Sequence, residues 1–243
     1  MECVYKRPES LTPYPMMFCP GCHHAILIKL VAEVLDEMNL RERAVLAAPI
    51  GCGGMTVPSA NFDTIFTLHG RVPSAGSAIK RLNPESLIIC YQGDGDAGAI
   101  GTAETVHTAR RGEAVTVIFV NNSVFGMTGG QVAPTTPVGT WTITSKKGNR
   151  EVPLKLPEML ATLDEPDYVA RCAVNNPKHI IQCKKAIKHA FERQLEGKYS
   201  FIEVVSACVT TMGIKAEKSP EFIDKVIKTD FPLGEFKRDG KRL

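Results

Sequence analysis

The segment Leu87-Ile-Ile-Cys-Tyr-Gln-Gly-Asp-Gly-Asp96 joins a short apolar run to two aspartates set among glycines. Its first five residues are typical of a buried β-strand, and the glycines permit a tight turn directly after it. A second apolar run, residues 115–120, ends in the same way at Asn121-Asn122. Polar side chains therefore follow two predicted strands at the point where each strand ends.

The rest of the chain continues an alternation of strands and helices. Apolar, β-branched runs predict further strands at residues 44–50, 168–174 and 201–206, and apolar residues recurring every three or four positions predict helices at 24–38, 99–111 and 177–195. This order predicts an α/β fold with a parallel sheet flanked by helices. In such sheets, ligands bind at the carboxyl ends of the strands.

The glycine-rich and polar segments of the chain fall directly after predicted strands. They are Gly51-Cys-Gly-Gly54, Gly93-Asp-Gly-Asp96, Asn121-Asn-Ser-Val-Phe-Gly126 and Ala207-Cys208. Because the carboxyl ends of parallel strands lie at one edge of a sheet, we expect one site to collect all four segments. Residues 128–157 are rich in Pro, Thr, Gly and Lys and show no clear period, so we expect a long functional or partner-contacting loop there.

Length and composition are those of an ordinary globular domain. The 243 residues, 44% hydrophobic and 23% charged, predict a single domain over residues 1–243 with a C-terminal extension at about 214–243. The net charge of +3 gives no reason to expect nucleic acid as a partner. No apolar run has membrane-spanning length and the first residues lack a signal-peptide core, so we expect a soluble, cytoplasmic protein with no membrane partner.

The strand ends at Asp94 and Asn122 suit a diphosphate held through Mg²⁺. This ion prefers hard oxygen ligands in octahedral geometry, and a carboxylate, an amide oxygen and a backbone carbonyl leave room for phosphate oxygens. Asp94, Asn122 and the carbonyl of Val124 fit those roles, while Gly93 and Gly95 let the backbone approach the phosphates. Each motif alone is more often an ordinary turn. Their joint position, each after a strand, favours a thiamine diphosphate site.

Four of the eight cysteines form a second constellation. Cys19-Pro-Gly-Cys22 is a Cys-x-x-Cys motif, and Cys52 and Cys208 each follow a predicted strand. Four thiolates suit either Zn²⁺ or an iron–sulfur cluster, and the spacing alone does not separate the two. A nearby thiamine cofactor favours a redox cluster, because it forms electron-rich intermediates. A structural zinc site and unliganded buried thiols remain the alternatives. The cysteines outside this set, not assigned to the site, are Cys3, Cys90, Cys172 and Cys183.

With these motifs the chain resembles the β subunit of 2-oxoacid:ferredoxin oxidoreductases, which include the pyruvate, 2-oxoglutarate and branched-chain 2-oxoacid enzymes. The resemblance covers most of the chain. Its landmarks are Cys19-Pro-Gly-Cys22, Gly51-Cys52, Leu68-His-Gly-Arg71, Gly93-Asp-Gly-Asp96, Asn121-Asn122, Phe125-Gly-Met-Thr-Gly-Gly-Gln131, Ala133-Pro-Thr135 and Ser206-Ala-Cys208. It implies a thiamine-diphosphate-binding fold like the pyrophosphate domain of transketolase.

The resemblance also implies the cofactors and their ligands. They are one 4Fe-4S cluster on Cys19, Cys22, Cys52 and Cys208, and thiamine diphosphate with Mg²⁺ on Asp94, Asn122 and Val124. The remaining expected cofactor contacts are Gly51, His69, Gly70, Arg71, Gly93, Gly95, Asp96, Gly126, Met127 and Thr128. Asp96 is expected to support its loop rather than bind the metal. The family commonly has Gly after the second cysteine and Pro after the last, whereas this chain has His23 and Val209.

Several of these residues also have ordinary structural interpretations. Taken alone, His69 is more often a core histidine, Arg71 a surface charge and Met127 a gap-filler in the core. Glu104 lies on the helix expected after the phosphate loop and is interpreted as a plain helical residue. No glutamate in the matched motifs suits activation of thiamine, so the catalytic residue is unknown in this chain. The resemblance implies that this glutamate comes from a separate α subunit.

The resemblance implies oxidative decarboxylation of a 2-oxoacid to acyl-CoA and CO₂, with electrons passed through the cluster to ferredoxin. The implied partners are the α subunit, commonly γ, and a ferredoxin-like δ subunit, with 2-oxoacid, coenzyme A and ferredoxin as substrates. The segments Gly53-Gly-Met-Thr-Val57 and 125–128 offer no cation for a second carboxylate, which favours branched-chain over 2-oxoglutarate substrates. The alternatives are a non-redox thiamine diphosphate decarboxylase or synthase subunit with a structural zinc, and a structural subunit without cofactor.

Overall fold

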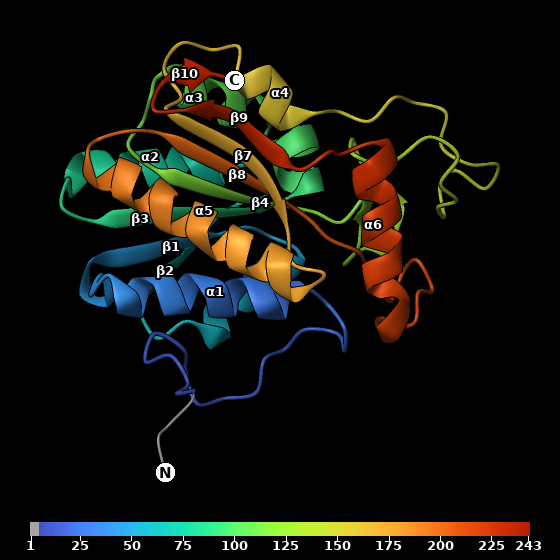
Figure 1. The fold of residues 1–243 in the computed structure, drawn as a ribbon, viewed down its shortest axis with the longest axis horizontal. Helices are drawn as coiled ribbons and strands as arrows, with labels where there is room; N and C mark the ends of the chain where they lie inside the picture. The colour runs from blue at the N-terminus through green and yellow to red at the C-terminus, as the bar shows by residue number, and fades with distance from the viewer. Residues whose placement is uncertain (1–4) are drawn as a thin grey trace.

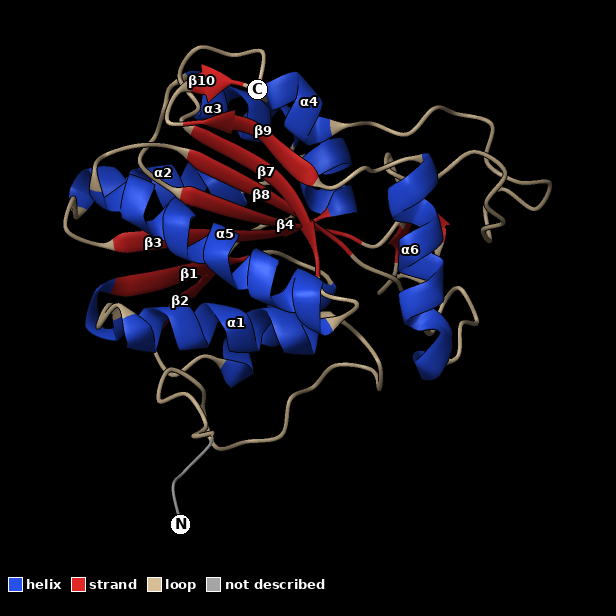
Figure 2. Ribbon diagram, viewed as in Figure 1, coloured by secondary structure: helices blue, strands red, loops and turns tan. Residues whose placement is uncertain are grey.

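Eight strands form one mixed sheet in the computed structural model, which describes residues 5–243 (Figures 1 and 2). The strand order is β2-β1-β3-β4-β8-β7-β9-β10, and the first six of these are parallel to one another. Their bounds are β1 Ala44–Ala48, β2 Asp63–Phe66, β3 Leu87–Gly93, β4 Thr116–Asn121, β7 Tyr168–Ala173 and β8 Ser200–Val205. All five strands expected from the apolar runs are present, and the α/β prediction is confirmed.

Three strands of the sheet were missed by sequence reasoning. Strand β2 is exposed along its whole length at one edge of the sheet, so it carries no apolar run. At the other side, β9 (Gly234–Arg238) pairs antiparallel with β7, and β10 (Lys241–Arg242) pairs with β9. Both are short and charged. They form from the expected C-terminal extension, which therefore returns to the sheet.

Helices cover both faces of the sheet. One face carries α1 (His24–Glu37) and α5 (Pro177–Leu195), which lie side by side in front of the strands in Figure 1. The other face carries α2 (Val72–Leu82), α3 (Thr102–Arg110) and α4 (Leu156–Leu160). Helix α5 begins where Asn176 accepts a hydrogen bond from the His179 amide at 2.9 Å and a proline occupies the first turn.

The helix expected at residues 99–111 begins differently from the prediction. Residues Asp96–Ile100 form a π-helical turn, in which the Gly101 amide donates to the Asp96 carbonyl at 2.8 Å, and α3 follows it. The wider turn accommodates the backbone of Gly70, because a Cβ at Gly101 would lie 2.4 Å from the Gly70 carbonyl oxygen. Contact with a distant loop, which local sequence does not reveal, therefore sets the start of this helix.

The C-terminal segment adds helix α6 (Ser219–Thr229) beyond the carboxyl ends of β7 and β8 (Figure 1). Its Ile223 and Val226 pack with Phe231 against Ala173 and Val205. The remaining short elements are the helical turns Arg41–Arg43, Cys52–Ser59 and Ala216–Lys218 and the hairpin of β5 (Val124–Phe125) and β6 (Gln131–Val132). No helix within residues 5–243 is long and apolar enough to cross a membrane.

The long loop expected at residues 128–157 is present apart from β6 and the first turn of α4. It is held by its own hydrogen bonds. The buried Asn149 side chain donates to the carbonyls of Thr136 and Glu151 at 2.7 and 2.9 Å, and its backbone carbonyl accepts from Gly139 at 2.7 Å. The loop nevertheless exposes Trp141 and Val138. A fixed backbone with exposed apolar side chains is typical of a contact surface.

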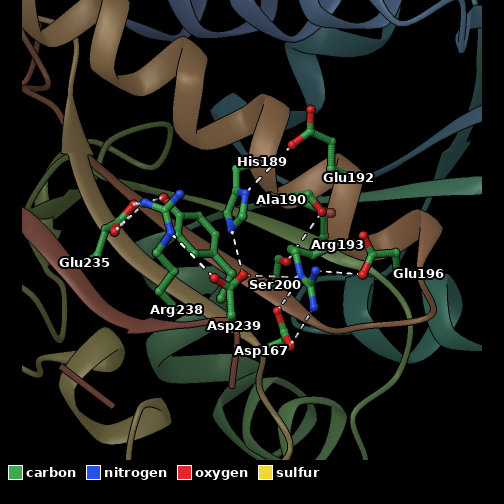
Figure 3. A network of polar contacts seen from close by, with 12 residues as sticks. Asp167, His189, Ala190, Glu192, Arg193, Glu196, Ser200, Glu235, Arg238 and Asp239 are labelled. Carbon is green, nitrogen blue, oxygen red and sulfur yellow. Dashed lines mark hydrogen bonds and ion pairs between the residues drawn. The ribbon is translucent and has the colours of Figure 1, made fainter. Parts of the chain in front are cut away.

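Charged side chains tie the end of α5 to the C-terminal hairpin (Figure 3). Arg193 donates to Asp167 and to Glu196, each at 2.6 Å, and its Nε lies 3.8 Å from an oxygen of Asp239. The Gly240 amide donates to the Asp167 carbonyl at 3.0 Å. These contacts hold the β9–β10 turn beside α5, so the hairpin covers the edge of β7.

A buried ion-pair network lies beneath the carboxyl ends of the central strands. The fully buried side chain of Arg171 on β7 donates to Glu203 on β8, and its other nitrogens donate to Glu158 at 2.8 and 2.6 Å. Glu203 also accepts from the Asn121 side chain at 2.6 Å. The network joins β4, β7 and β8, and each buried charge depends on its partner because burial of an unpaired charge is costly.

We expect Arg171→Met to reduce the free energy of unfolding by about 3–5 kcal/mol, because Glu203 would stay buried without its cation. Urea denaturation measures this change. Arg238→Met is the matched control, since Arg238 pairs with Glu235 at the surface, where solvent screens the pair, and its loss should change the free energy of unfolding far less. Equal losses in the two variants would contradict the importance of the buried pair.

Candidate functional site

The predicted motif residues meet around one cavity at the carboxyl ends of β1, β3 and β4. The cavity has a volume of about 100 Å³. Its lining consists of His24, Ile50, Gly51, Cys52, Gly53, His69, Gly93, Asp94, Gly95, Asp96, Asn122, Val124, Phe125, Gly126, Met127 and Thr128. A larger hollow of about 660 Å³ lies between the N-terminal segment and α1 and contains none of these residues. The cavity with the motif residues is therefore the candidate site.

Asp94 is a buried carboxylate in the wall of this cavity. One oxygen accepts from the Gly95 amide at 2.8 Å and the other from the Thr135 hydroxyl at 3.0 Å. Burial raises the pKa of Asp94 to about 7, although hydrogen bonds from Thr135, Gly95, Ser123 and Asn122 oppose the rise. A carboxylate so poorly solvated gains stability from a cation, which fits the role of a metal ligand.

The two asparagines at the end of β4 contact different parts of the protein. Asn121 is buried and donates to Glu203 in the network below the sheet edge. Asn122 lies in the cavity lining, and its side-chain oxygen accepts from the Val124 amide at 3.3 Å. Ser123, with φ of 66°, turns the chain between them and Val124. Asn122 and Val124 therefore line the same cavity as Asp94.

Asp96 holds the neighbouring loop in place. One of its oxygens accepts from the Gly70 amide at 2.6 Å and lies 2.6 Å from Nδ1 of His69. The other accepts from Gln92 at 2.7 Å. Both of its oxygens bind protein groups, as expected for a residue that supports the loop. His69 reaches the cavity, with its side chain 30% exposed.

The expected cofactor contacts differ in their relation to the cavity. Gly51, Gly126, Met127 and Thr128 line it, with the last two exposed to solvent. Gly70 supports the wall through Asp96. Arg71 is absent from the lining and forms an ion pair with Glu104 on α3. Its side chain is half exposed, which agrees with the ordinary interpretation of a surface charge.

Two of the four candidate cluster cysteines, Cys52 and Cys208, lie beside the cavity. A Cβ placed at Gly126 would lie 3.0 Å from the sulfur of Cys208, 3.8 Å from that of Cys52 and 3.7 Å from the side-chain nitrogen of Asn122. Gly126 therefore lies close both to two of the thiols and to Asn122, an expected metal ligand. Any side chain at this position would crowd the sulfurs.

Electrostatic coupling connects all four thiols. The pKa of Cys22 is raised to about 12, mainly by burial and to a smaller extent by the thiols of Cys52, Cys208 and Cys19. Burial also raises the pKa of Cys52 to about 11, with smaller contributions from Cys208, Cys19 and Asp94. Such thiols are protonated at neutral pH unless a metal replaces the proton. Within residues 5–243, no three His, Cys, Asp or Glu side chains lie close enough to share a single metal ion.

The other cysteines lie apart from this group. Cys90, Cys172 and Cys183 are buried, in agreement with core positions for the two expected to lie in strands. Cys3 lies outside the described residues. Its exclusion from the site stays a prediction.

Sequence reasoning missed four side chains that shape the site. His24 and Tyr91 form a buried hydrogen bond of 2.8 Å under the cavity, and burial lowers the pKa of His24 to about 4, so the ring is neutral. Thr135 binds Asp94, and Thr211 donates to the sulfur of Cys208. Two of them have a sequence signal, because His24 follows Cys22-His23 and Thr135 ends the motif Ala133-Pro-Thr. Neither signal specifies the contact.

The domain class follows from this fold and cavity. Residues 49–204 match the family described as "Thiamine pyrophosphate enzyme, C-terminal TPP binding domain". A solved 2-oxoglutarate:ferredoxin oxidoreductase from Magnetococcus marinus, with 2-oxoglutarate, coenzyme A and succinyl-CoA bound, shares the fold with a TM-score of 0.79 and 22% identity. The match covers 97% of this chain and 85% of that chain.

Sequence relatives narrow the class further. Ketoisovalerate oxidoreductase subunit VorA of Methanothermobacter thermautotrophicus is 40% identical over 96% of this chain and 50% of its own length. 2-oxoglutarate synthase subunit KorB of Archaeoglobus fulgidus is 37% identical, over 93% and 80% of the two chains. The β subunit of a Saccharolobus solfataricus 2-oxoacid:ferredoxin oxidoreductase is 34% identical, over 88% and 68%. The chain belongs to the family of 2-oxoacid:ferredoxin oxidoreductase β subunits. It spans about half the length of the ketoisovalerate oxidoreductase subunits.

The packing of the cavity floor gives a test that needs no cofactor. A Cβ at Gly95 would lie 2.1 Å from the ring of Phe125, whereas a Cβ at Gly93 would meet nothing within 4 Å. We expect Gly95→Ala to lower the free energy of unfolding by about 1–3 kcal/mol and Gly93→Ala to change it by less than about 1 kcal/mol. Adding Phe125→Ala should relieve part of the Gly95→Ala effect. Urea denaturation of Gly93→Ala, Gly95→Ala, Phe125→Ala and the Gly95→Ala/Phe125→Ala double variant measures the coupling. Equal stabilities for Gly93→Ala and Gly95→Ala would contradict this packing.

Proposed function

We propose that this chain is the thiamine-diphosphate-binding and cluster-binding β subunit of a coenzyme A-dependent 2-oxoacid:ferredoxin oxidoreductase. The observation that carries the proposal is the position of Gly126 in the Asn122 loop, because a Cβ there would lie 3.0 and 3.8 Å from the sulfurs of Cys208 and Cys52. A cofactor bound at Asp94 would lie beside a cluster bound at these cysteines. Residues 1–243 act as one unit in this proposal.

Asp94, Asn122 and the carbonyl of Val124 hold Mg²⁺ in the proposed site, and Gly93, Gly95 and Gly51 allow the diphosphate to approach the backbone. The raised pKa of Asp94 and its place in the cavity wall support this assignment. Bound thiamine diphosphate supplies the electron sink for decarboxylation of the 2-oxoacid. Thr135 orients the carboxylate of Asp94, and Asp96 keeps His69 and Gly70 against the cavity.

Cys19, Cys22, Cys52 and Cys208 hold a 4Fe-4S cluster in this proposal. The mutual effect of their thiols on the pKa values of Cys22 and Cys52 supports a shared site. In a four-iron cluster each cysteine binds a different iron, so the four sulfurs do not have to surround one ion. The cluster supplies a one-electron acceptor between substrate and ferredoxin.

The cavity lining favours an apolar, branched-chain 2-oxoacid. It contains no lysine or arginine that would bind a second carboxylate, whereas Ile50, Phe125 and Met127 offer apolar surface. The similarity to a ketoisovalerate oxidoreductase subunit agrees with this preference. The similarity to 2-oxoglutarate synthase subunits makes 2-oxoglutarate the second candidate.

A partner chain completes the active site. The cavity of about 100 Å³ is smaller than the roughly 300–1,000 Å³ of typical cofactor sites, and no glutamate lines it. We therefore assign the glutamate that activates thiamine to an α subunit seated over the cavity. The complex would also contain γ and a ferredoxin-like δ subunit, with coenzyme A as the acyl acceptor. The exposed loop at residues 128–157 suits contact with one of these chains.

We expect Asp94→Asn to abolish retention of Mg²⁺ and thiamine diphosphate in the purified complex, because the amide removes the charged ligand while keeping the shape. Cofactor content after desalting, together with circular dichroism, measures this. Asp164→Asn, which alters an exposed carboxylate, should keep wild-type cofactor content. Full cofactor retention by Asp94→Asn would show that the diphosphate site lies elsewhere.

Metal analysis tests the cluster. We expect about four irons per β subunit in the anaerobically purified complex, and Cys208→Ser should yield an incomplete or oxygen-labile cluster because serine is a harder ligand. Cys172→Ala, a change at a core thiol, should keep the iron. One zinc per chain and no iron would favour the non-redox thiamine enzyme instead. Unchanged iron in Cys208→Ser would remove Cys208 from the ligand set.

A further inference from the structure

The hydroxyl of Thr211 is directed at a candidate cluster ligand. It donates to the sulfur of Cys208 with an oxygen–sulfur distance of 2.9 Å. The two residues lie in one turn, where the Met212 amide donates to the Cys208 carbonyl at 3.2 Å. The turn fixes the hydroxyl beside the sulfur, so the contact does not depend on a long, flexible side chain.

A second segment of the chain packs against the Thr211 side chain. A Cβ at Gly130 would lie 3.0 Å from the Cβ of Thr211, so the threonine packs directly against the backbone of Gly130. The Gly130 amide donates to the Phe125 carbonyl at 2.9 Å, which ties this backbone to the loop that contains Gly126. Thr211 is thus fixed between the Cys208 turn and the loop beside the cavity.

The sulfur that receives this hydrogen bond lies next to the cofactor loop. Cys208 is the thiol nearest to Gly126, at 3.0 Å from the position of a Cβ there. An iron on Cys208 would therefore belong to the side of the cluster that faces thiamine diphosphate. A hydrogen bond to a thiolate stabilises its more electron-rich state, which is the state of the reduced cluster.

We propose that Thr211 is a positioning residue that raises the reduction potential of the cluster through its hydrogen bond to Cys208. This inference rests on the proposed function, because it requires the cluster. Neighbouring donors to ligand atoms commonly tune metal sites in this way. Loss of the hydroxyl should make the cluster harder to reduce and slow its reduction by substrate.

The test uses the anaerobically purified complex with Thr211→Val, which keeps the shape of the side chain and removes the hydroxyl. Iron content and the midpoint potential, followed by electron paramagnetic resonance during a redox titration, are the readouts. We expect full iron and a shift to more negative potential. Thr211→Ser should restore the wild-type potential, and Thr210→Val, a change at an exposed neighbour, should leave it unchanged.

The outcomes separate this inference from the proposed function. Full iron with an unchanged potential in Thr211→Val overturns the role of Thr211 and leaves the cluster assignment intact. A wild-type complex without iron overturns the cluster itself. Thr211→Ala provides a second variant without the hydroxyl. Loss of iron in both Thr211→Val and Thr211→Ala, with full iron in Thr210→Val, would show a role in assembly and contradict tuning.

Discussion

The close approach of two loops at Gly126 is the constraint on which the proposed chemistry depends. The glycine lies close to Asn122, an expected metal ligand, and to the sulfurs of Cys52 and Cys208, and it adds no side chain that would crowd them. A cofactor bound in the cavity would therefore lie close to these two thiols. The site therefore depends on contact between backbone segments as much as on the ligand side chains.

The sheet brings these segments together because its parallel strands end at one edge. Strands β1, β3, β4 and β8 lie next to one another in the sheet in this order. The loops that follow them carry Cys52, Asp94, Asn122 and Cys208. The Arg171–Glu203–Asn121 network locks the ends of three strands below the site. Asp96, through Gly70, adds a loop that no strand of the motif supplies.

Sequence predicted the central strands and the motif residues because burial leaves a local signal in apolar runs and the ligands have characteristic spacing. It missed β2, β9 and β10, whose exposed or charged residues pair only when the sheet provides an edge. It also missed Thr135, Tyr91 and Thr211, whose contacts join segments or depend on the shape of one turn. Arg71 forms its ion pair with Glu104 outside the cavity, and this pairing depends on how α3 packs.

An experimental structure of the complex loaded with both cofactors tests the central claim most directly. The account predicts a metal-bound diphosphate on Asp94 and Asn122 and an iron–sulfur cluster on Cys19, Cys22, Cys52 and Cys208, with Gly126 between the two centres. A diphosphate bound away from Asp94, or a cluster separated from it by another element of the chain, would contradict the account.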